Sequence, residues 1–224
     1  LRLTGDAIVS DNTTFSVYTL DLSDFALTLD DNMAGLSVSQ ALTLDAGTEQ
    51  IISGAADLSL NGGVNVNAGT ISSTGGTFSA SSFNVGAAGT VNIQGGTLTL
   101  PAGGTAVTGA AFTTSDTTIS LGGTLEVADT WTSTNTNLSL TTDASLSSTT
   151  PLVLATLATN GHDFDLDSVT TDLTLANAFT LSSGKISTHG ADLIFESSAD
   201  ISSESSLDAG DGGKFEFKQG GTAN

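Results

Sequence analysis

Residues 96–100 read GTLTL, and an apolar pair of this form, Leu-x-Leu, returns about every twenty residues along the chain. Other close copies are ADLSL at 56–60, TTISL at 117–121, TNLSL at 136–140, TDLTL at 171–175 and ADLIF at 191–195. The apolar pairs begin at Leu20, Val38, Leu58, Phe78, Leu98, Ile119, Leu138, Leu152 or Leu154, Leu173 and Leu193, with Phe215 as a further candidate. Such a period predicts a repeat protein in which each unit buries its apolar face against its neighbours.

Two further apolar positions follow the first pair within each repeat. An apolar pair comes about six residues later, in Leu42/Leu44, Val64/Val66, Phe83/Val85, Leu125/Val127 and Phe179/Leu181. A third apolar position comes about thirteen residues after the first, in Ile51, Ile71, Val91, Phe112, Trp131, Phe164, Ile186 and Leu207. Apolar and polar residues that alternate point to opposite faces of a β-strand, and the Gly, Asn, Asp, Ser and Thr between them favour turns.

Three short strands and three corners in each repeat predict one rung of a parallel β-helix. We therefore expect an all-β fold, a single-stranded, right-handed parallel β-helix (β-solenoid) of about ten rungs of about 20 residues, with three short strands per rung. Residues 1–224 would form one solenoid domain, a fragment of a longer repetitive surface protein. A β-sandwich is the main alternative, because it also joins short strands by regular turns. The uneven spacing of the three strands favours the right-handed coil over the left-handed one.

The charge of the chain limits its partners. It has 24 acidic and 4 basic side chains and a formal net charge of -20. Nucleic acid is therefore not an expected partner, since binding to phosphates requires Lys and Arg. The longest apolar run, 152–158, is too short to cross a membrane, so no membrane insertion is expected. The chain has no Cys, which excludes a disulfide framework and thiolate metal sites.

The residue between the two members of the first apolar pair is often a hydroxyl residue. In a stacked coil these residues would form a surface hydroxyl ladder of Ser59, Ser79, Thr99, Ser120, Ser139 and Thr174. Such a ladder could contact an ordered surface, such as ice or a crystalline polysaccharide, or carry glycans. The alternative is that these are ordinary outward strand residues, since small hydroxyl side chains suit that position.

Acidic residues gather in the C-terminal half and suggest a cation site. The set consists of Asp163, Asp165, Asp167, Asp172 and Asp192. The first three alternate along the chain and share one face, and the last two fall in adjacent repeats. Ca²⁺ prefers clustered carboxylate oxygens, so it is the one candidate cofactor, although no known calcium loop is matched. Solvated acidic corners are the alternative interpretation. The two histidines, His162 and His189, lie at different offsets and predict no catalytic triad.

The stretches GGTLTL at 95–100 and GGTLEV at 122–127 resemble the strand repeats of autotransporter passengers and other right-handed β-helix surface adhesins. The resemblance implies a secreted or surface-displayed bacterial rod that serves in adhesion or as a stalk. It identifies no functional residues.

These observations predict an extracellular structural or adhesive rod segment that is not an enzyme. Its expected partners are a host-cell or matrix surface, including glycans. One alternative is a carbohydrate-binding module or a polysaccharide-degrading enzyme of the same architecture, in which Asp163 and Asp165 would be the paired carboxylates. A further alternative is a filament subunit that stacks end to end through its open rungs.

Overall fold

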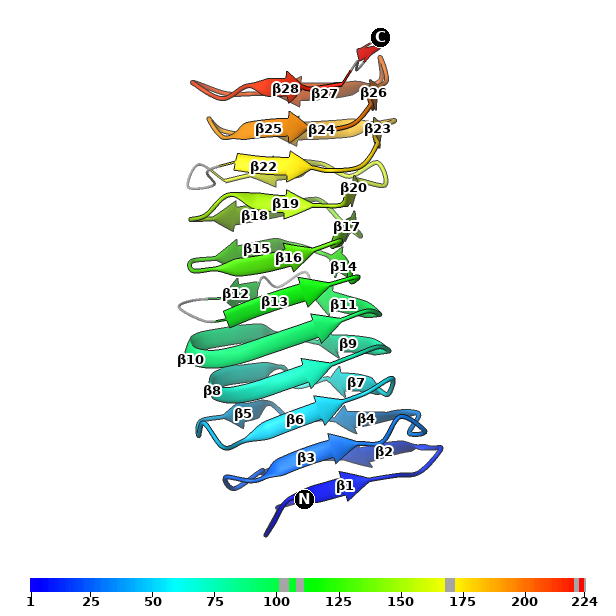
Figure 1. The fold of residues 1–224 in the computed structure, drawn as a ribbon, viewed down its shortest axis with the longest axis vertical. Helices are drawn as coiled ribbons and strands as arrows, with labels where there is room; N and C mark the ends of the chain where they lie inside the picture. Colours follow the sequence, from blue (N-terminus) through cyan, green and yellow to red (C-terminus); the bar gives the residue numbers. More distant parts are fainter. Residues whose placement is uncertain (101–104, 108–110, 168–171, 220–221, 224) are drawn as a thin grey trace.

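The chain winds as a coil of parallel β-strands in which each turn lies on the one before it (Figure 1). The computed structural model describes residues 1–224 except 101–104, 108–110, 168–171, 220–221 and 224. Within these described residues there are strands and turns and no helix. About ten turns of about twenty residues follow one another along the axis. The predicted β-solenoid is confirmed, and the antiparallel β-sandwich is wrong.

Each turn crosses three faces, which we name I, II and III in the order in which the chain passes through them. Face I consists of β2 (Thr14–Val17), β4 (Gly35–Val38), β7 (Asp57–Leu60), β9 (Thr77–Ala80), β11 (Thr97–Leu100), β14 (Thr118–Leu121), β17 (Asn137–Leu140), β20 (Thr156–Ala158), β23 (Phe179–Leu181), β26 (Ala199–Ile201) and β29 (Thr222–Ala223). Face II consists of β5 (Leu42–Leu44), the first parts of β8 (Val64–Ser73) and β10 (Phe83–Gln94), β12 (Thr105–Val107), β15 (Thr124–Val127), β18 (Ala144–Ser148), β21 (Phe164–Leu166), β24 (Gly184–Ser187) and β27 (Ser205–Asp208). Face III consists of β1 (Ala7–Val9), β3 (Ala26–Leu29), β6 (Gln50–Ser53), the second parts of β8 and β10, β13 (Ala111–Ser115), β16 (Trp131–Thr134), β19 (Leu152–Leu154), β22 (Asp172–Leu175), β25 (Asp192–Phe195) and β28 (Phe215–Phe217).

The sense of the coil is visible in Figure 1. The face III strands in front run from left to right, the strands behind them run from right to left, and the chain rises from the N-terminus at the bottom to the C-terminus at the top. A coil that turns in this sense while it rises is right-handed, as the spacing of the strands predicted.

Apolar side chains of equivalent strands stack into columns inside the coil. On face I, Leu58, Phe78, Leu98 and Ile119 are neighbours in register, and each is at most 1% exposed. Full burial of one such side chain contributes about 1.5–3 kcal/mol. Each rung alone would expose this column, so the stacking of neighbouring turns is what stabilises the fold.

The corner between faces III and I also buries hydroxyl groups. Thr114 and Thr136 are fully buried, and their Oγ1 atoms are 2.8 Å apart. The indole N–H of Trp131 donates to Thr114 Oγ1 at 2.9 Å. Ser53 occupies the same corner lower in the coil and donates to the carbonyl of Ala56. These hydroxyls satisfy groups that would otherwise be buried without a partner.

The sequence-based assignment of strands to faces is correct from Leu58 to Leu140 and wrong after it. The apolar pairs expected on face I at Leu152, Leu173, Leu193 and Phe215 lie on face III, and the later pairs and third positions are shifted likewise. The cause is β18, in which the buried Ser148 stands level with the inward Val127 of β15, so the second member of the apolar pair is missing. The apolar pattern skips this strand, and every later assignment rotates by one face.

Candidate functional site

Face I carries a row of hydroxyl groups on its outer side. Strand pairing places Ser59, Ser79, Thr99, Ser120 and Ser139 one above another in successive turns. The Oγ atoms of Ser59 and Ser79 are 3.5 Å apart. All five residues are half-buried, because neighbouring side chains cover their flanks. The row is a regular line of small polar groups along one face of the coil.

Thr174 does not belong to this row, which corrects the expected ladder. It lies on face III between Val153 and Ile194, because the strand assignment rotates after β17. The row instead continues toward the N-terminus through Ser37 and Ser16.

A second polar row runs beside the first on face I, and the sequence analysis missed it. It contains Thr77, Thr97, Thr118 and Asn137, each two residues before a member of the first row. The signal was present as Thr-x-Ser or Thr-x-Thr, in which the middle residue points inward and both hydroxyl residues point outward. Asn137 accepts a hydrogen bond from Thr156 at 2.7 Å through its side chain. Face I is therefore a two-row polar surface, part of which is already engaged in hydrogen bonds between turns.

Face II contains an open hollow of about 450 Å³ in the upper half of the coil. Its lining comes from four successive turns, in β15, β18, β21 and β24 and the corners before them. The polar side chains that line it are those of Thr124, Asp143, Ser145, Asp163, Asp165, Lys185 and Ser187. Two of the predicted metal ligands, Asp163 and Asp165, thus lie together here.

The carboxylates in the hollow hold the next turn of the backbone. Asp143 accepts a hydrogen bond from the backbone N–H of Asp163 at 3.0 Å, and Asp163 accepts one from the N–H of Lys185 at 2.8 Å. Asp165 Oδ1 is shielded from solvent and lies 2.6 Å from His189 Nε2, in a contact that does not have hydrogen-bond geometry. His162 Nδ1 is 3.7 Å from Asp143 Oδ1 at the edge of the same hollow.

The basic side chain of this hollow is also paired. Lys185 Nζ lies 2.8 Å from Asp208 Oδ2 of the next turn. Hydrogen bonding to Asp208 and the negative charge of that carboxylate raise the pKa of Lys185. Hydrogen bonds from Lys185 and from the backbone of Gly210 lower the pKa of Asp208. Lys185 is therefore held as a cation that joins two turns.

The remaining predicted metal ligands are divided between faces. Asp172 and Asp192 pair in register on face III, as expected for adjacent turns. Asp192 accepts a hydrogen bond from the N–H of Lys214 at 3.2 Å and is 3.2 Å from its Nζ. Asp167 follows β21 on the face II side. Across the described part of the chain, no three His, Asp or Glu side chains come together in a way that could hold a metal ion.

Comparisons with models of protein families, with curated proteins and with solved structures find no match to this chain. No helix among the described residues has the length and apolar character needed to cross a membrane. The residues and geometry above are therefore the basis for the function proposed next.

Proposed function

We propose that this chain is a structural and adhesive segment of an extracellular bacterial surface rod and that it catalyses no reaction. The observation that supports this is the outer surface of faces I and III, where polar side chains recur in register over several successive turns. A rigid array of repeated groups gives many weak contacts at once to an extended partner, which raises overall avidity. Host-cell or matrix surfaces that carry glycans are partners of this kind.

The chemistry of the hollow on face II supports a role without catalysis. A carboxylic acid that donates a proton in glycoside hydrolysis is kept protonated by an apolar or anionic environment. The side chain of Asp143 is 77% exposed, and that of Asp165 is about half exposed and faces a histidine. Asp163 uses one oxygen to hold the next turn. These groups act as connectors between turns.

The test has two parts. Negative-stain electron microscopy of the purified chain should show short rods, and immobilised host-matrix and glycan surfaces should retain the chain without chemical change to either. If no surface retains the chain, the adhesive proposal is wrong and only a spacer role remains.

A polysaccharide hydrolase is the second candidate, because the hollow gathers three carboxylates and Lys185 in one open depression. Release of reducing sugar from a polysaccharide panel would support it, provided that Asp163→Asn abolishes the release. Asp172→Asn is the matched control, since that carboxylate lies on another face. Sugar release that is lost in the first variant and kept in the second would replace the adhesive proposal.

A further inference from the structure

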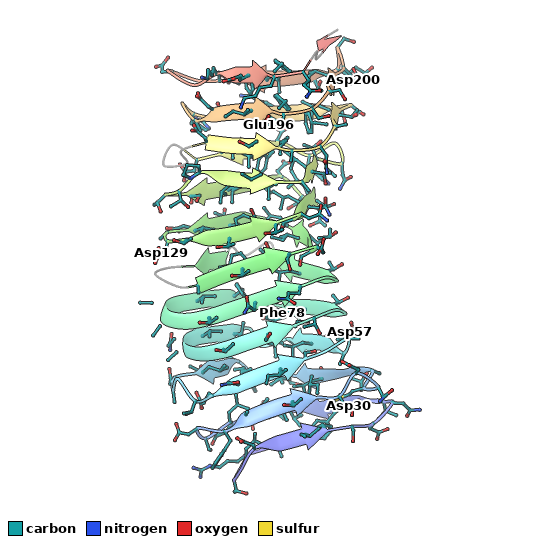
Figure 2. The ribbon with its side chains drawn as sticks, in the orientation of Figure 1. Asp30, Asp57, Phe78, Asp129, Glu196 and Asp200 are labelled. Atoms are coloured by element: carbon teal, nitrogen blue, oxygen red, sulfur yellow. The ribbon has the colours of Figure 1, made fainter. Side chains whose placement is uncertain are left out.

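The charge of this acidic rod is segregated along its axis. No Asp, Glu, Lys, Arg or His occurs in residues 58–115, whereas nine acidic side chains precede this segment and fifteen follow it. The segment forms about three complete turns, from β7 to β13. Figure 2 shows Asp30 and Asp57 in the lower turns and Asp129, Glu196 and Asp200 in the upper turns, with Phe78 between them. We name residues 58–115 the neutral belt.

On face III the neutral belt presents a grid of polar side chains. Three adjacent strands, β8, β10 and β13, are paired in register here. Their outward side chains, half-buried or exposed, are Thr70, Ser72, Thr90, Asn92, Gln94, Thr113 and Ser115. These strands are the longest of the face, and β8 and β10 continue around the corner from face II without an intervening loop (Figure 1). At β8 and β10 the chain therefore passes from face II to the grid within one strand.

The hydrogen-bonding groups of this grid are unused within the described structure. No side chain of the grid makes a hydrogen bond to another described residue. On face II, by contrast, the amide of Asn84 donates to Asn65 at 3.1 Å and the amide of Asn67 donates to Asp45 at 2.7 Å. On face I the outward polar groups of the belt are hydroxyls, and Ser79 lies 3.5 Å from Ser59, whereas the grid also carries the amides of Asn92 and Gln94. The face III grid therefore keeps its donors and acceptors available for a partner.

The charge pattern indicates whether that partner is charged or uncharged. The acidic turns on both sides of the belt repel anionic polymers and other copies of this chain, each with a net charge of -20. An uncharged partner meets neither repulsion nor the cost of desolvating a charged group at the belt. Hydroxyl and amide groups in a fixed array match the hydroxyl groups of a repeating sugar chain.

We propose that the face III grid of the neutral belt binds uncharged polysaccharide. This inference rests on the adhesive function proposed above and assigns it a surface and a class of partner. Because the contact lacks charged groups, its affinity does not follow the salt dependence of electrostatic binding.

The test measures retention of the full chain on microcrystalline cellulose and on an insoluble uncharged β-glucan, with alginate as the anionic comparison. Asn92→Asp replaces an amide donor of the grid by a carboxylate of the same shape. Gln94→Glu does the same at an exposed position, where misfolding is not expected. Asn65→Asp is the matched control, since it makes the same change in the belt on face II and keeps the acceptor oxygen that Asn84 uses.

The chain should bind at least one uncharged polysaccharide equally at low and high salt and should not bind alginate. Asn92→Asp and Gln94→Glu should each weaken binding about tenfold, and Asn65→Asp should leave it unchanged. Equal loss in all three variants, retention that salt abolishes, or binding to neither uncharged probe would overturn the assignment. If other host surfaces retain the chain and Asn92→Asp does not change this retention, the adhesive function stands and only the assignment of binding to the grid is refuted.

Discussion

The buried hydroxyl corner of the coil gives the sharpest test of the structure. Thr114→Val keeps the shape of the side chain but removes its hydroxyl, which accepts from the indole N–H of Trp131 and is paired with Thr136. All three residues are at most 5% exposed, so water cannot replace the lost partner. Loss of a hydrogen bond together with one buried donor left unpaired costs about 2–3 kcal/mol of unfolding free energy. We therefore expect Thr114→Val to be among the most destabilising single-atom changes in the chain.

Thr113→Val is the matched control, because the neighbouring hydroxyl points outward on face III and has no hydrogen-bond partner among the described residues. Its effect on the unfolding free energy should be within about 0.5 kcal/mol. Trp131 is the only Trp in the chain, so its fluorescence during urea unfolding reports on this rung alone.

A double-mutant cycle isolates the hydrogen bond itself. Trp131→Phe removes the donor and should also destabilise the rung, but in its background Thr114→Val no longer leaves an indole N–H unpaired. The double variant should be more stable than the sum of the single effects predicts, by about 1 kcal/mol, measured by far-ultraviolet circular dichroism. Additive effects, or equal costs for Thr114→Val and Thr113→Val, would refute the buried network.

Three further predictions concern other parts of the coil. Gly96→Ala should lower the free energy of unfolding, measured in urea, more than Gly212→Ala does. Both glycines have positive φ, but only at Gly96 would a Cβ lie 2.0 Å from a backbone oxygen. An equal loss of unfolding free energy in the two variants would contradict the close packing at Gly96. Leu98→Asp should cost about 3–5 kcal/mol of unfolding free energy by burying an unpaired charge, and an unchanged melting curve would refute the column. Asp208→Asn should lower the pKa of Lys185, measured by NMR titration. In the unaltered chain the pair stabilises the fold between the ordinary pKa values of Asp and Lys. This contribution is lost as the pH falls through the lowered pKa of Asp208 or rises through the raised pKa of Lys185.

Much of the fold could be predicted because the inward positions are almost all large and apolar. Where Leu58, Phe78, Leu98 and Ile119 recur on the same face, the period of about twenty residues is unambiguous. The prediction failed where the chain buries small polar residues instead. Ser148 lies fully buried in β18 and donates to the carbonyl of Thr150, a pairing that no apolar pattern can indicate. One such strand was enough to rotate the assignment of all later strands.

The candidate sites could be predicted less well, because they depend on which turns become neighbours. Asp163 and Asp165 were expected together, and the structure brings them together with Asp143 and Lys185. The hydrogen bonds that Asp143 and Asp163 accept from backbone N–H groups could not be inferred, since these require the register between turns. The face III grid was not recognised for a different reason: its members are ordinary polar residues, and their place side by side within the uncharged turns depends on the register between strands.

The start of the face I strands shows how one corner of the neutral belt dispenses with a charge. The N–H of Thr77 donates to the carboxylate of Asp57 in the turn below, at 2.6 Å. One turn higher, the N–H of Thr97 donates instead to the backbone carbonyl of Gly76, at 3.0 Å, and the next turn repeats this with Gly96. A backbone carbonyl thus takes the place of the carboxylate as the acceptor, so this join does not require a charge. In register, Asp57 is followed by Thr77 and Thr97, so threonine stands where the turn below has aspartate, and this corner of the belt presents hydroxyl groups in place of a charge.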